Sequence, residues 1–249
     1  MIGSALYRQP VLLDSTLHRT KRLAPLADFS IARHLHAVAL TAVEFPQGNL
    51  VLPITFVPTG GRLADGRAMV SPAALLGLSA AENLCLDGAR WDARFLPAFI
   101  RRYPFLTAPL AGSGSPGVFV DAAWSGFSDE AGEPLFADDG ARTPALERAL
   151  GFLREFDEEA RKTRVFCERL VEHDLLEDMQ ADATLPGGQT LKVDGFLTLN
   201  ARRFADLPDE VVLDWHRNGM LMLLHAHQMS LANVRHLVER KVNRISKER

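Results

Sequence analysis

One run of apolar residues constrains this fold more than any other feature of the sequence. Apolar or small residues recur every three or four positions from Leu146 to Leu170, a spacing that places them on one face of an α-helix. Thr143 and Pro144 precede the run, and a threonine N-cap followed by proline favours a helix start. The pattern predicts a helix of about 28 residues, roughly 40 Å long. The predicted stripe consists of Leu146, Leu150, Leu153, Phe156, Ala160, Thr163, Cys167 and Leu170.

The remaining faces of this helix are charged. Ten acidic and six basic residues lie between Glu147 and Asp178, most of them off the stripe, which is typical of a solvated surface. Cys167 belongs to the apolar stripe, so we expect its thiol to be buried.

The sequence before residue 140 is typical of strands with long loops. Leu35 to Phe45 alternates in part, and Val51 to Val57 follows a turn at residues 47–49, so we expect a hairpin. Pro53 cannot donate a hydrogen bond to a neighbouring strand, which predicts an edge strand or a bulge there. Further short strands are expected at residues 68–70, 84–86 and 118–122.

The sequence after the long helix contains a further hairpin and two helices. Residues 186–189 are Pro-Gly-Gly-Gln between two short apolar runs, which indicates a hairpin turn. Leu207-Pro208-Asp209-Glu210 favours a helix start, Asn218-Gly219 a stop, and a periodic run then continues from Met220 to about Val242. Six basic and two acidic residues follow from Arg235 onward; they suit the end of their own helix dipole or the acidic helix face.

These patterns predict an α+β fold, in which a β-rich N-terminal half with long loops packs against a mainly helical C-terminal half. We expect a single domain over residues 1–249, with a soft internal boundary near 140 between a β-rich part (1–140) and a helical part (141–249).

Composition excludes several functional classes. The 28 Lys and Arg residues against 31 Asp and Glu residues give a net charge of −3, so we expect no nucleic-acid partner. Two cysteines, Cys85 and Cys167, are too few for a disulfide scaffold or a four-thiolate zinc site. Residues 1–15 lack the apolar core of a signal peptide, and the most apolar run, Met220 to Leu224, is too short to span a bilayer. We therefore expect a cytoplasmic protein without membrane insertion, with signal-less export left open.

No motif predicts a metal or a cofactor. Residues 112–117 match the spelling G-x-G-x-x-G, but a strand-like segment follows where a helix should begin, so we expect a flexible hairpin loop. His34 and His36 would share one face of a strand, yet no third ligand is evident. His227 lies near an apolar helix stripe, which predicts a hydrogen-bonded core histidine.

The segment from Arg90 to Phe105 is chemically the most specific, because it interleaves four arginines with five aromatic residues. Guanidinium groups bind carboxylate or phosphate oxygens and stack on aromatic rings. An anionic or peptide ligand is therefore one hypothesis. In the other, the aromatic side chains enter the core and the arginines pair with Glu82, Asp87 or Asp92. The candidate ligand-binding residues of the first hypothesis are Arg94, Arg101, Arg102, Tyr103 and Trp91.

We add Glu44 to this candidate site. Glu44 follows an apolar run and precedes Phe45-Pro46, so its carboxylate is expected to be partly buried. Such a group acts as a general acid or base, or receives an arginine, and pairing with arginine is the commoner outcome.

The same segment resembles the signature of the SapC family of bacterial proteins. The resemblance is carried by residues 82–84, Trp91 and 94–105, and it extends through Leu40 to Pro46, 135–140, 175–180 and 207–210. The family is named after a surface-layer system, and its members resemble one another more clearly than they resemble any enzyme of known mechanism. Many members are encoded near outer-membrane receptors and halogenase-like and cupin-like proteins, which implies an accessory role in uptake or surface-protein modification.

Three functional hypotheses follow. The leading one is a non-enzymatic accessory or binding protein that recognises a protein partner or a small anionic ligand. The second is an enzyme that acts on a peptide or a small anionic substrate by carboxylate chemistry, and the third is an exported surface-layer component. The absence of zinc-protease, redox, hydrolase and P-loop motifs favours the first.

Overall fold

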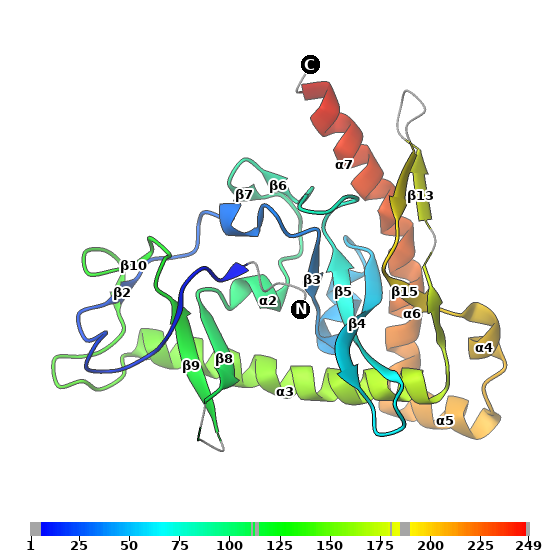
Figure 1. The fold of residues 1–249 in the computed structure, drawn as a ribbon, viewed down its shortest axis with the longest axis horizontal. Coiled ribbons are helices and arrows are strands. Elements are labelled where there is room, and N and C mark those ends of the chain that lie inside the picture. Colours follow the sequence, from blue (N-terminus) through cyan, green and yellow to red (C-terminus); the bar gives the residue numbers. More distant parts are fainter. Residues whose placement is uncertain (1–5, 111, 113–114, 180, 185–189, 248–249) are drawn as a thin grey trace.

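The long helix predicted from Thr143 onward is the central element of the structure, a computed structural model that describes residues 6–110, 112, 115–179, 181–184 and 190–247 (Figure 1). Helix α3 spans Pro144–Glu172, and the Thr143 side chain accepts the N–H of Leu146. Its buried side chains are those of Ala145, Leu146, Leu150, Leu153, Thr163, Phe166, Cys167 and Leu170. The predicted stripe, including Cys167, is confirmed.

Shorter helices surround α3. They are α1 (Phe45–Gly48), α2 (Ala98–Arg101), α4 (Ala201–Ala205), α5 (Asp209–Asn218), α6 (Met220–Ser230) and α7 (Val234–Lys247), with 3-10 turns η2 (Ser30–Ala32), η3 (Ala42–Glu44) and η4 (Leu231–Asn233). The predicted start near Leu207 and the stop at Asn218-Gly219 are confirmed. Gly219 adopts φ 84°, a left-handed conformation that favours glycine and separates α5 from α6.

Among the described residues, the strands form one five-stranded sheet, two three-stranded sheets and two pairs; one three-stranded sheet, with the order β10-β2-β11, has only two residues in each strand. The other two sheets have the orders β12-β15-β4-β5-β3 and β1-β9-β8. Their strands are β1 (Pro10–Leu12), β3 (Ala37–Ala39), β4 (Ile54–Arg62), β5 (Ala68–Leu75), β8 (Phe105–Pro109), β9 (Pro116–Asp121), β12 (Leu176–Asp178) and β15 (Leu197–Leu199). The small pairings involve β2 (Arg22–Leu23), β6 (Leu86–Asp87), β7 (Arg90–Trp91), β10 (Phe127–Ser128), β11 (Glu133–Pro134), β13 (Ala181–Thr184) and β14 (Thr190–Val193).

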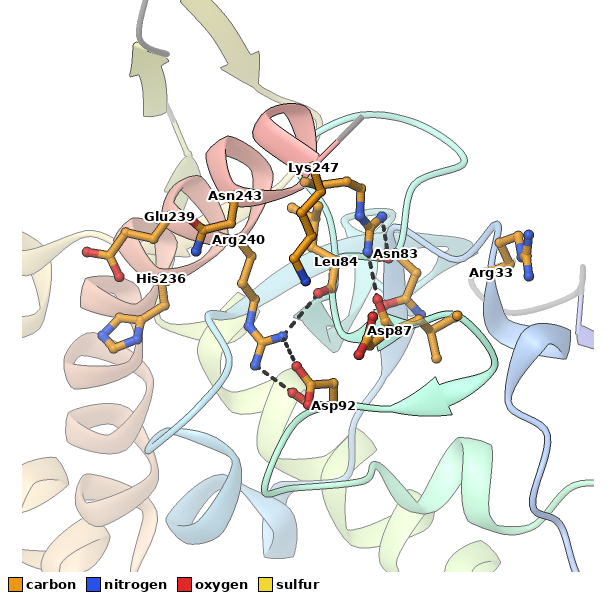
Figure 2. Close-up of a pocket in the computed structure, with 13 residues that line it drawn as sticks. Arg33, Asn83, Leu84, Asp87, Asp92, His236, Glu239, Arg240, Asn243 and Lys247 are labelled. Atoms are coloured by element: carbon orange, nitrogen blue, oxygen red, sulfur yellow. Dashed lines mark hydrogen bonds and ion pairs between the residues drawn. The ribbon is translucent and has the colours of Figure 1, made fainter. Parts of the chain in front are cut away.

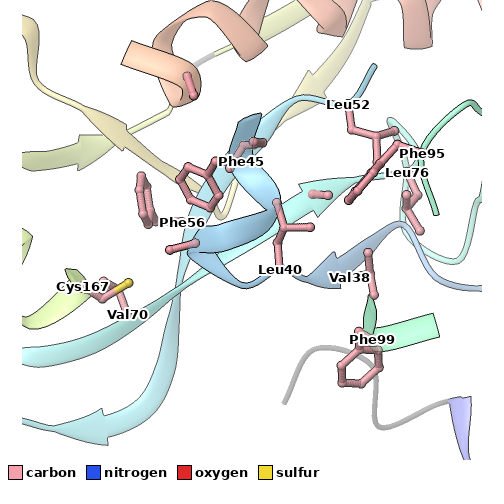
Figure 3. Packing of buried hydrophobic residues seen from close by; sticks show 14 of the residues in the cluster. Val38, Leu40, Phe45, Leu52, Phe56, Val70, Leu76, Phe95, Phe99 and Cys167 are labelled. Carbon is pink, nitrogen blue, oxygen red and sulfur yellow. The ribbon is translucent and has the colours of Figure 1, made fainter. Parts of the chain in front are cut away.

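The five-stranded sheet is buried on both faces, because its alternate side chains enter two apolar clusters. Val38, Phe56 and Ala74 lie in one cluster with Phe166 and Cys167 of α3 (Figure 3). Their sequence neighbours Ala37, Val57, Ala73 and Leu75 face the other cluster with Leu237 of α7. Helices α3 and α7 therefore cover opposite faces of this sheet.

Helix α3 also reaches the three-stranded sheet β1-β9-β8. Its N-terminal half packs Leu146, Leu150 and Leu153 against Phe105 of β8 and Val120 of β9. Figure 1 shows the helix running beneath both sheets. One amphipathic helix thus joins the two sheets, as an apolar stripe of this length allows.

The hairpin expected between residues 35–45 and 51–57 is wrong. Strand β5 lies between β3 and β4, pairing Ala37 with Leu75 and Ile54 with Ala74. The reason is a capping box, in which Thr41 and Glu44 satisfy each other's hydrogen bonds and turn the chain into η3 and α1. Residues 47–49 thus end a helix rather than form a hairpin turn.

Of the two alternatives expected for the strand at Pro53, the edge position is wrong, whereas the strand does carry a register irregularity. Pro53 precedes β4, which lies in the interior of the sheet between β15 and β5. The register irregularity falls between Pro58 and Arg62 instead, and Pro53 contributes only its carbonyl, which accepts the N–H of Leu75.

The two glycine-containing hairpins are present as antiparallel pairs. β8 pairs with β9 around residues 110–115, and β13 pairs with β14 around residues 185–189. Residues 111, 113–114 and 185–189 lie outside the described part of the chain, so the expected loop flexibility stays a prediction.

The predicted α+β class is confirmed, with most of the sheet residues before residue 140 and most of the helix after it. The single-domain assignment stays a prediction. Among the described residues, no helix is both long and apolar enough to cross a bilayer.

Candidate functional site

The predicted Arg and aromatic segment connects β7 to β8 through α2. Its aromatic side chains enter the core, as the alternative to a ligand site expects: Phe95, Phe99 and Tyr103 are buried in the cluster under the five-stranded sheet. Trp91 is half-buried, and its indole N–H donates to the carbonyl of Phe95 at 2.9 Å. The indole N–H of Trp91 is therefore used inside the fold.

Glu44 is buried and fully engaged by backbone and hydroxyl donors. Its Oε2 accepts the N–H and the hydroxyl of Thr41 at 2.9 and 2.7 Å, and its Oε1 accepts the N–H of Ala98 at 2.7 Å. Pairing with an arginine was the expected outcome and is wrong: none of the salt bridges among the described residues includes Glu44. Glu44 positions the first residue of α2.

Tyr103 and Arg102 come together around Tyr7. The Tyr103 hydroxyl donates to Asp121 at 2.9 Å, and its ring lies 5.5 Å from that of Tyr7. Burial raises the pKa of Tyr7, while the nearby Arg102 charge opposes that rise. Burial also raises the pKa of Tyr103, and the hydrogen bond to Asp121 adds to it. This cluster holds the N-terminal strand, because Asp121 also accepts the N–H groups of residues 8 and 9.

The three candidate arginines have different surroundings. The Arg102 guanidinium lies between the rings of Phe99 and Phe156, at 4.3 and 4.5 Å from their centroids. Arg101 is exposed and stacks over Phe152 at 5.1 Å. Arg94 is exposed as well and, within the described part of the chain, its side chain forms no hydrogen bond or ion pair.

The histidines of the sequence analysis do not form a metal site. His34 is exposed, and His36 is half-buried with its ring 6.2 Å from Phe196. Across residues that the structure describes, no group of three His, Cys, Asp or Glu side chains is placed to hold a metal ion. His227 is a core histidine, as predicted, with Nδ1–H donating to the carbonyl of Ile54 at 2.8 Å.

A cleft of about 670 Å³ lies between α7 and the segment 83–92 (Figure 2). We call it the α7 cleft. It is lined by Arg33, Asn83, Leu84, Leu86, Asp87, Gly88, Asp92, His236, Glu239, Arg240, Asn243, Arg244 and Lys247. Of the predicted site residues, none lines it, although Trp91 and Arg94 flank Asp92 in the sequence.

Helix α7 is positioned over this cleft by two kinds of contact. Leu237, which is 2% exposed, anchors the first half of the helix in the apolar cluster of the sheet. The second half is held by polar contacts: Arg240 donates to Asp92 and to the Leu84 carbonyl, and Lys241 pairs with Glu82. Arg244 donates to the carbonyls of residues 83 and 86 at 3.0 and 2.8 Å.

The α7 cleft carries surplus positive charge. Arg33, Arg240, Arg244 and Lys247 line it together with three carboxylates. Those carboxylates also pair with two further arginines: Arg90 lies 3.3 and 3.0 Å from Asp87 and Asp92, and Arg235 lies 3.2 Å from Glu239. Six cationic side chains thus meet three carboxylates, and a surplus of three positive charges is suited to an anion.

Two of these cations have no direct partner among the described residues, although Arg33 interacts electrostatically with the Asp28 carboxylate. In the part of the chain described, the side chains of Arg33 and Lys247 form neither an ion pair nor a hydrogen bond. They come from different elements, because Arg33 follows η2 and Lys247 ends α7. Figure 2 shows Lys247 extending from the helix and Arg33 standing apart from it.

The sequence patterns did not predict this cleft, although the basic C-terminal tail is evident in them. Neither of the expected partners, the helix dipole or the acidic face of α3, explains the contacts of α7 with residues 82–92. The available signal was the spacing of Arg240, Arg244 and Lys247, which recur at i, i+4 and i+7 and therefore share one helix face.

The SapC family model matches residues 13–237 of the chain. The chain belongs to the SapC family. The match includes Arg33, Asp87 and Asp92 of the α7 cleft, while Arg240, Arg244 and Lys247 lie beyond its last residue. No curated protein and no solved structure matches this SapC-family chain.

Proposed function

We propose that this SapC-family protein is a non-enzymatic accessory protein that binds an anionic ligand, or an acidic part of a protein partner, in the α7 cleft. The observation that carries the proposal is the surplus of three positive charges among the side chains that line the cleft or pair with them. Acidic groups of a ligand would offset that surplus, because guanidinium and ammonium groups donate strongly to carboxylate and phosphate oxygens.

The state of the carboxylates supports binding rather than carboxylate catalysis. Asp92 is held by Arg90 and Arg240, and Asp87 by Arg90. Glu44, the other candidate acid, lies elsewhere and is saturated by Thr41 and Ala98. A general acid or base needs a carboxylate that exchanges a proton with the substrate, and these groups are already used as hydrogen-bond acceptors.

Arg94 and Arg101 belong to the same proposal as additional contacts for an acidic partner. Both guanidinium groups face solvent, and neither has a carboxylate partner among the described residues. Arginine remains charged at physiological pH, so these two side chains are available to an outside anion.

Family membership supports an accessory role in an uptake or surface-protein modification system. In this proposal the protein works in the cytoplasm, beside the proteins that carry out the chemistry.

Isothermal titration calorimetry at low salt, with pyrophosphate and with citrate as probes, tests the proposal. We expect at least one anion to bind the wild-type protein in a single site. The double variant Arg33→Glu, Lys247→Glu should lose that binding. It replaces two cations with carboxylates, whose negative charges repel an anionic ligand.

Arg217→Glu is the matched control, since Arg217 is an exposed residue of α5 outside the cleft lining. It should bind as the wild type does. Absence of binding for both anions, or an equal loss in the control, would overturn the proposal. Thermal unfolding of each variant verifies that the protein is folded.

A further inference from the structure

We infer that the α7 cleft selects phosphate over carboxylate and that its ligand carries a diphosphate or a similar polyphosphate group. This inference rests on the proposed function and names the chemistry of the ligand. It stands on three features of the cleft: the separate elements that carry its cations, the pairing of its carboxylates and the way its arginines are held.

The cations come from separate elements of the fold. Arg240 and Lys247 extend from α7, while Arg33 comes from the chain after η2 (Figure 2). A carboxylate has two oxygens in one plane, and it is best bound from one side by a single guanidinium fork. A phosphate group is tetrahedral and presents oxygens in several directions, so donors from separate elements suit it better.

The carboxylates in the cleft are already paired with arginines. Asp92 accepts from Arg240 through Oδ2 and lies within 3.0 Å of Arg90 through Oδ1. Asp87 and Glu239 pair with Arg90 and Arg235. Among the residues that the structure describes, no lining carboxylate is therefore left unpaired to repel an anionic ligand, and the charged groups left for a ligand are cations.

Arg244 is held in place without losing its charge. Its two terminal nitrogens donate to the backbone carbonyls of Asn83 and Leu86. A carbonyl fixes the direction of a guanidinium but does not neutralise it, unlike a carboxylate. Arg240 is similarly held by the carbonyls of Leu84 and Asp92, in addition to the Asp92 carboxylate. Cations fixed in this way need little reordering when an anion arrives.

The amount of surplus charge points the same way. One carboxylate would offset one of the three surplus charges, whereas a diphosphate concentrates several negative charges in one small group. The cleft volume of about 670 Å³ also leaves space for an organic substituent. Inorganic pyrophosphate and a nucleoside diphosphate are therefore both suitable probes of this chemistry.

The test compares dissociation constants for pyrophosphate, ADP and citrate by calorimetry on the full chain. We expect the better phosphate compound to bind about tenfold more tightly than citrate. Arg33→Gln and Lys247→Gln should each weaken that binding about tenfold, the effect of one lost charged hydrogen bond. Arg217→Gln should leave it unchanged. Tighter binding of ADP than of pyrophosphate would show that the cleft also binds the adenosine group of ADP.

The possible failures are distinguishable. If citrate binds as tightly as both phosphate compounds, the phosphate inference is wrong while anion binding in the cleft stands. If no probe binds, the inference and the proposed function are both wrong. If phosphate binding survives Arg33→Gln and Lys247→Gln unchanged, it occurs at another place and the inference is again wrong.

Discussion

Oε1 of Glu44 accepts the backbone N–H of Ala98 at 2.7 Å, and this one hydrogen bond joins the turn after β3 to the start of α2. The N–H groups of a helix's first turn have no partner within the helix, so a buried carboxylate from elsewhere in the fold satisfies this one. Through its other oxygen, Glu44 also holds Thr41. The carboxylate is thus a structural link beneath the predicted Arg and aromatic segment.

Glu44→Ala should destabilise the protein by about 3 kcal/mol, because it leaves two buried backbone N–H groups without an acceptor. Urea unfolding monitored by tryptophan fluorescence measures this loss. Glu155→Ala, at an exposed position of α3, should change stability by less than about 0.5 kcal/mol. Equal stability of both variants would show that the Glu44 hydrogen bonds contribute little.

The elements predicted correctly are those defined by local patterns. The stripe from Leu146 to Leu170 and the Thr143-Pro144 start suffice for α3, because helix periodicity and capping act over a few residues. The hairpin error has a local cause too. Thr41-x-x-Glu44 is itself a capping-box sequence, and it outweighs the partial alternation of residues 35–45.

The α7 cleft could not be predicted in the same way. Its defining contacts join Arg240 to Asp92 and Arg244 to Asn83, residues separated by 148 and 161 positions. Such pairing depends on which sheet face α7 covers, and the apolar residues of α7 do not specify that face. The sequence therefore indicates a basic helix face but not its partner.

His227 should make stability depend on pH. Burial lowers its pKa from 6.5 to about 4, and Nε2 already accepts the N–H of Leu199 at 3.1 Å. Between these two pKa values the unfolded chain binds the additional proton. The free energy of unfolding should therefore fall by up to about 1.4 kcal/mol per unit as pH drops from 6.5 toward 4.

Two histidine variants test whether His227 causes this dependence of the unfolding free energy on pH. His227→Gln should reduce the dependence of unfolding free energy on pH in that range, whereas His216→Gln, at an exposed position, should keep it. An NMR titration provides a second measurement, in which the His227 ring signals should not shift between pH 7.5 and 5.5. A midpoint near pH 6.5 would contradict the buried, neutral state.

Cys85 and Cys167 should not react in the native protein. Both thiols are buried, and burial raises the pKa of Cys85 to about 12 and raises that of Cys167 as well. Since the thiolate is the nucleophile, iodoacetamide at pH 8 should label neither residue before denaturation and both after it. Mass spectrometry identifies the labelled peptides. Labelling of Cys167 in the folded protein would mean that α3 separates readily from the five-stranded sheet.

Arg101 and Arg102 are adjacent in sequence but should respond differently to substitution. Arg102 is half-buried between Phe99 and Phe156, so Arg102→Ala removes two cation–π contacts and the packing of its stem, and should cost about 2 kcal/mol. Arg101 is exposed over Phe152, and Arg101→Ala should change stability by less than about 1 kcal/mol.

For partner binding, in contrast to stability, Arg101 is the residue that we expect to matter. If Arg101 contacts an acidic partner, Arg101→Ala should weaken retention on an immobilised poly-glutamate column, while Arg148→Ala, another exposed arginine, should elute with the wild type. Arg101→Lys should restore part of the retention, because it keeps the charge but not the planar fork. Unchanged retention of Arg101→Ala, or a stability loss as large as that of Arg102→Ala, would show that Arg101 is part of the core architecture rather than a contact for a partner.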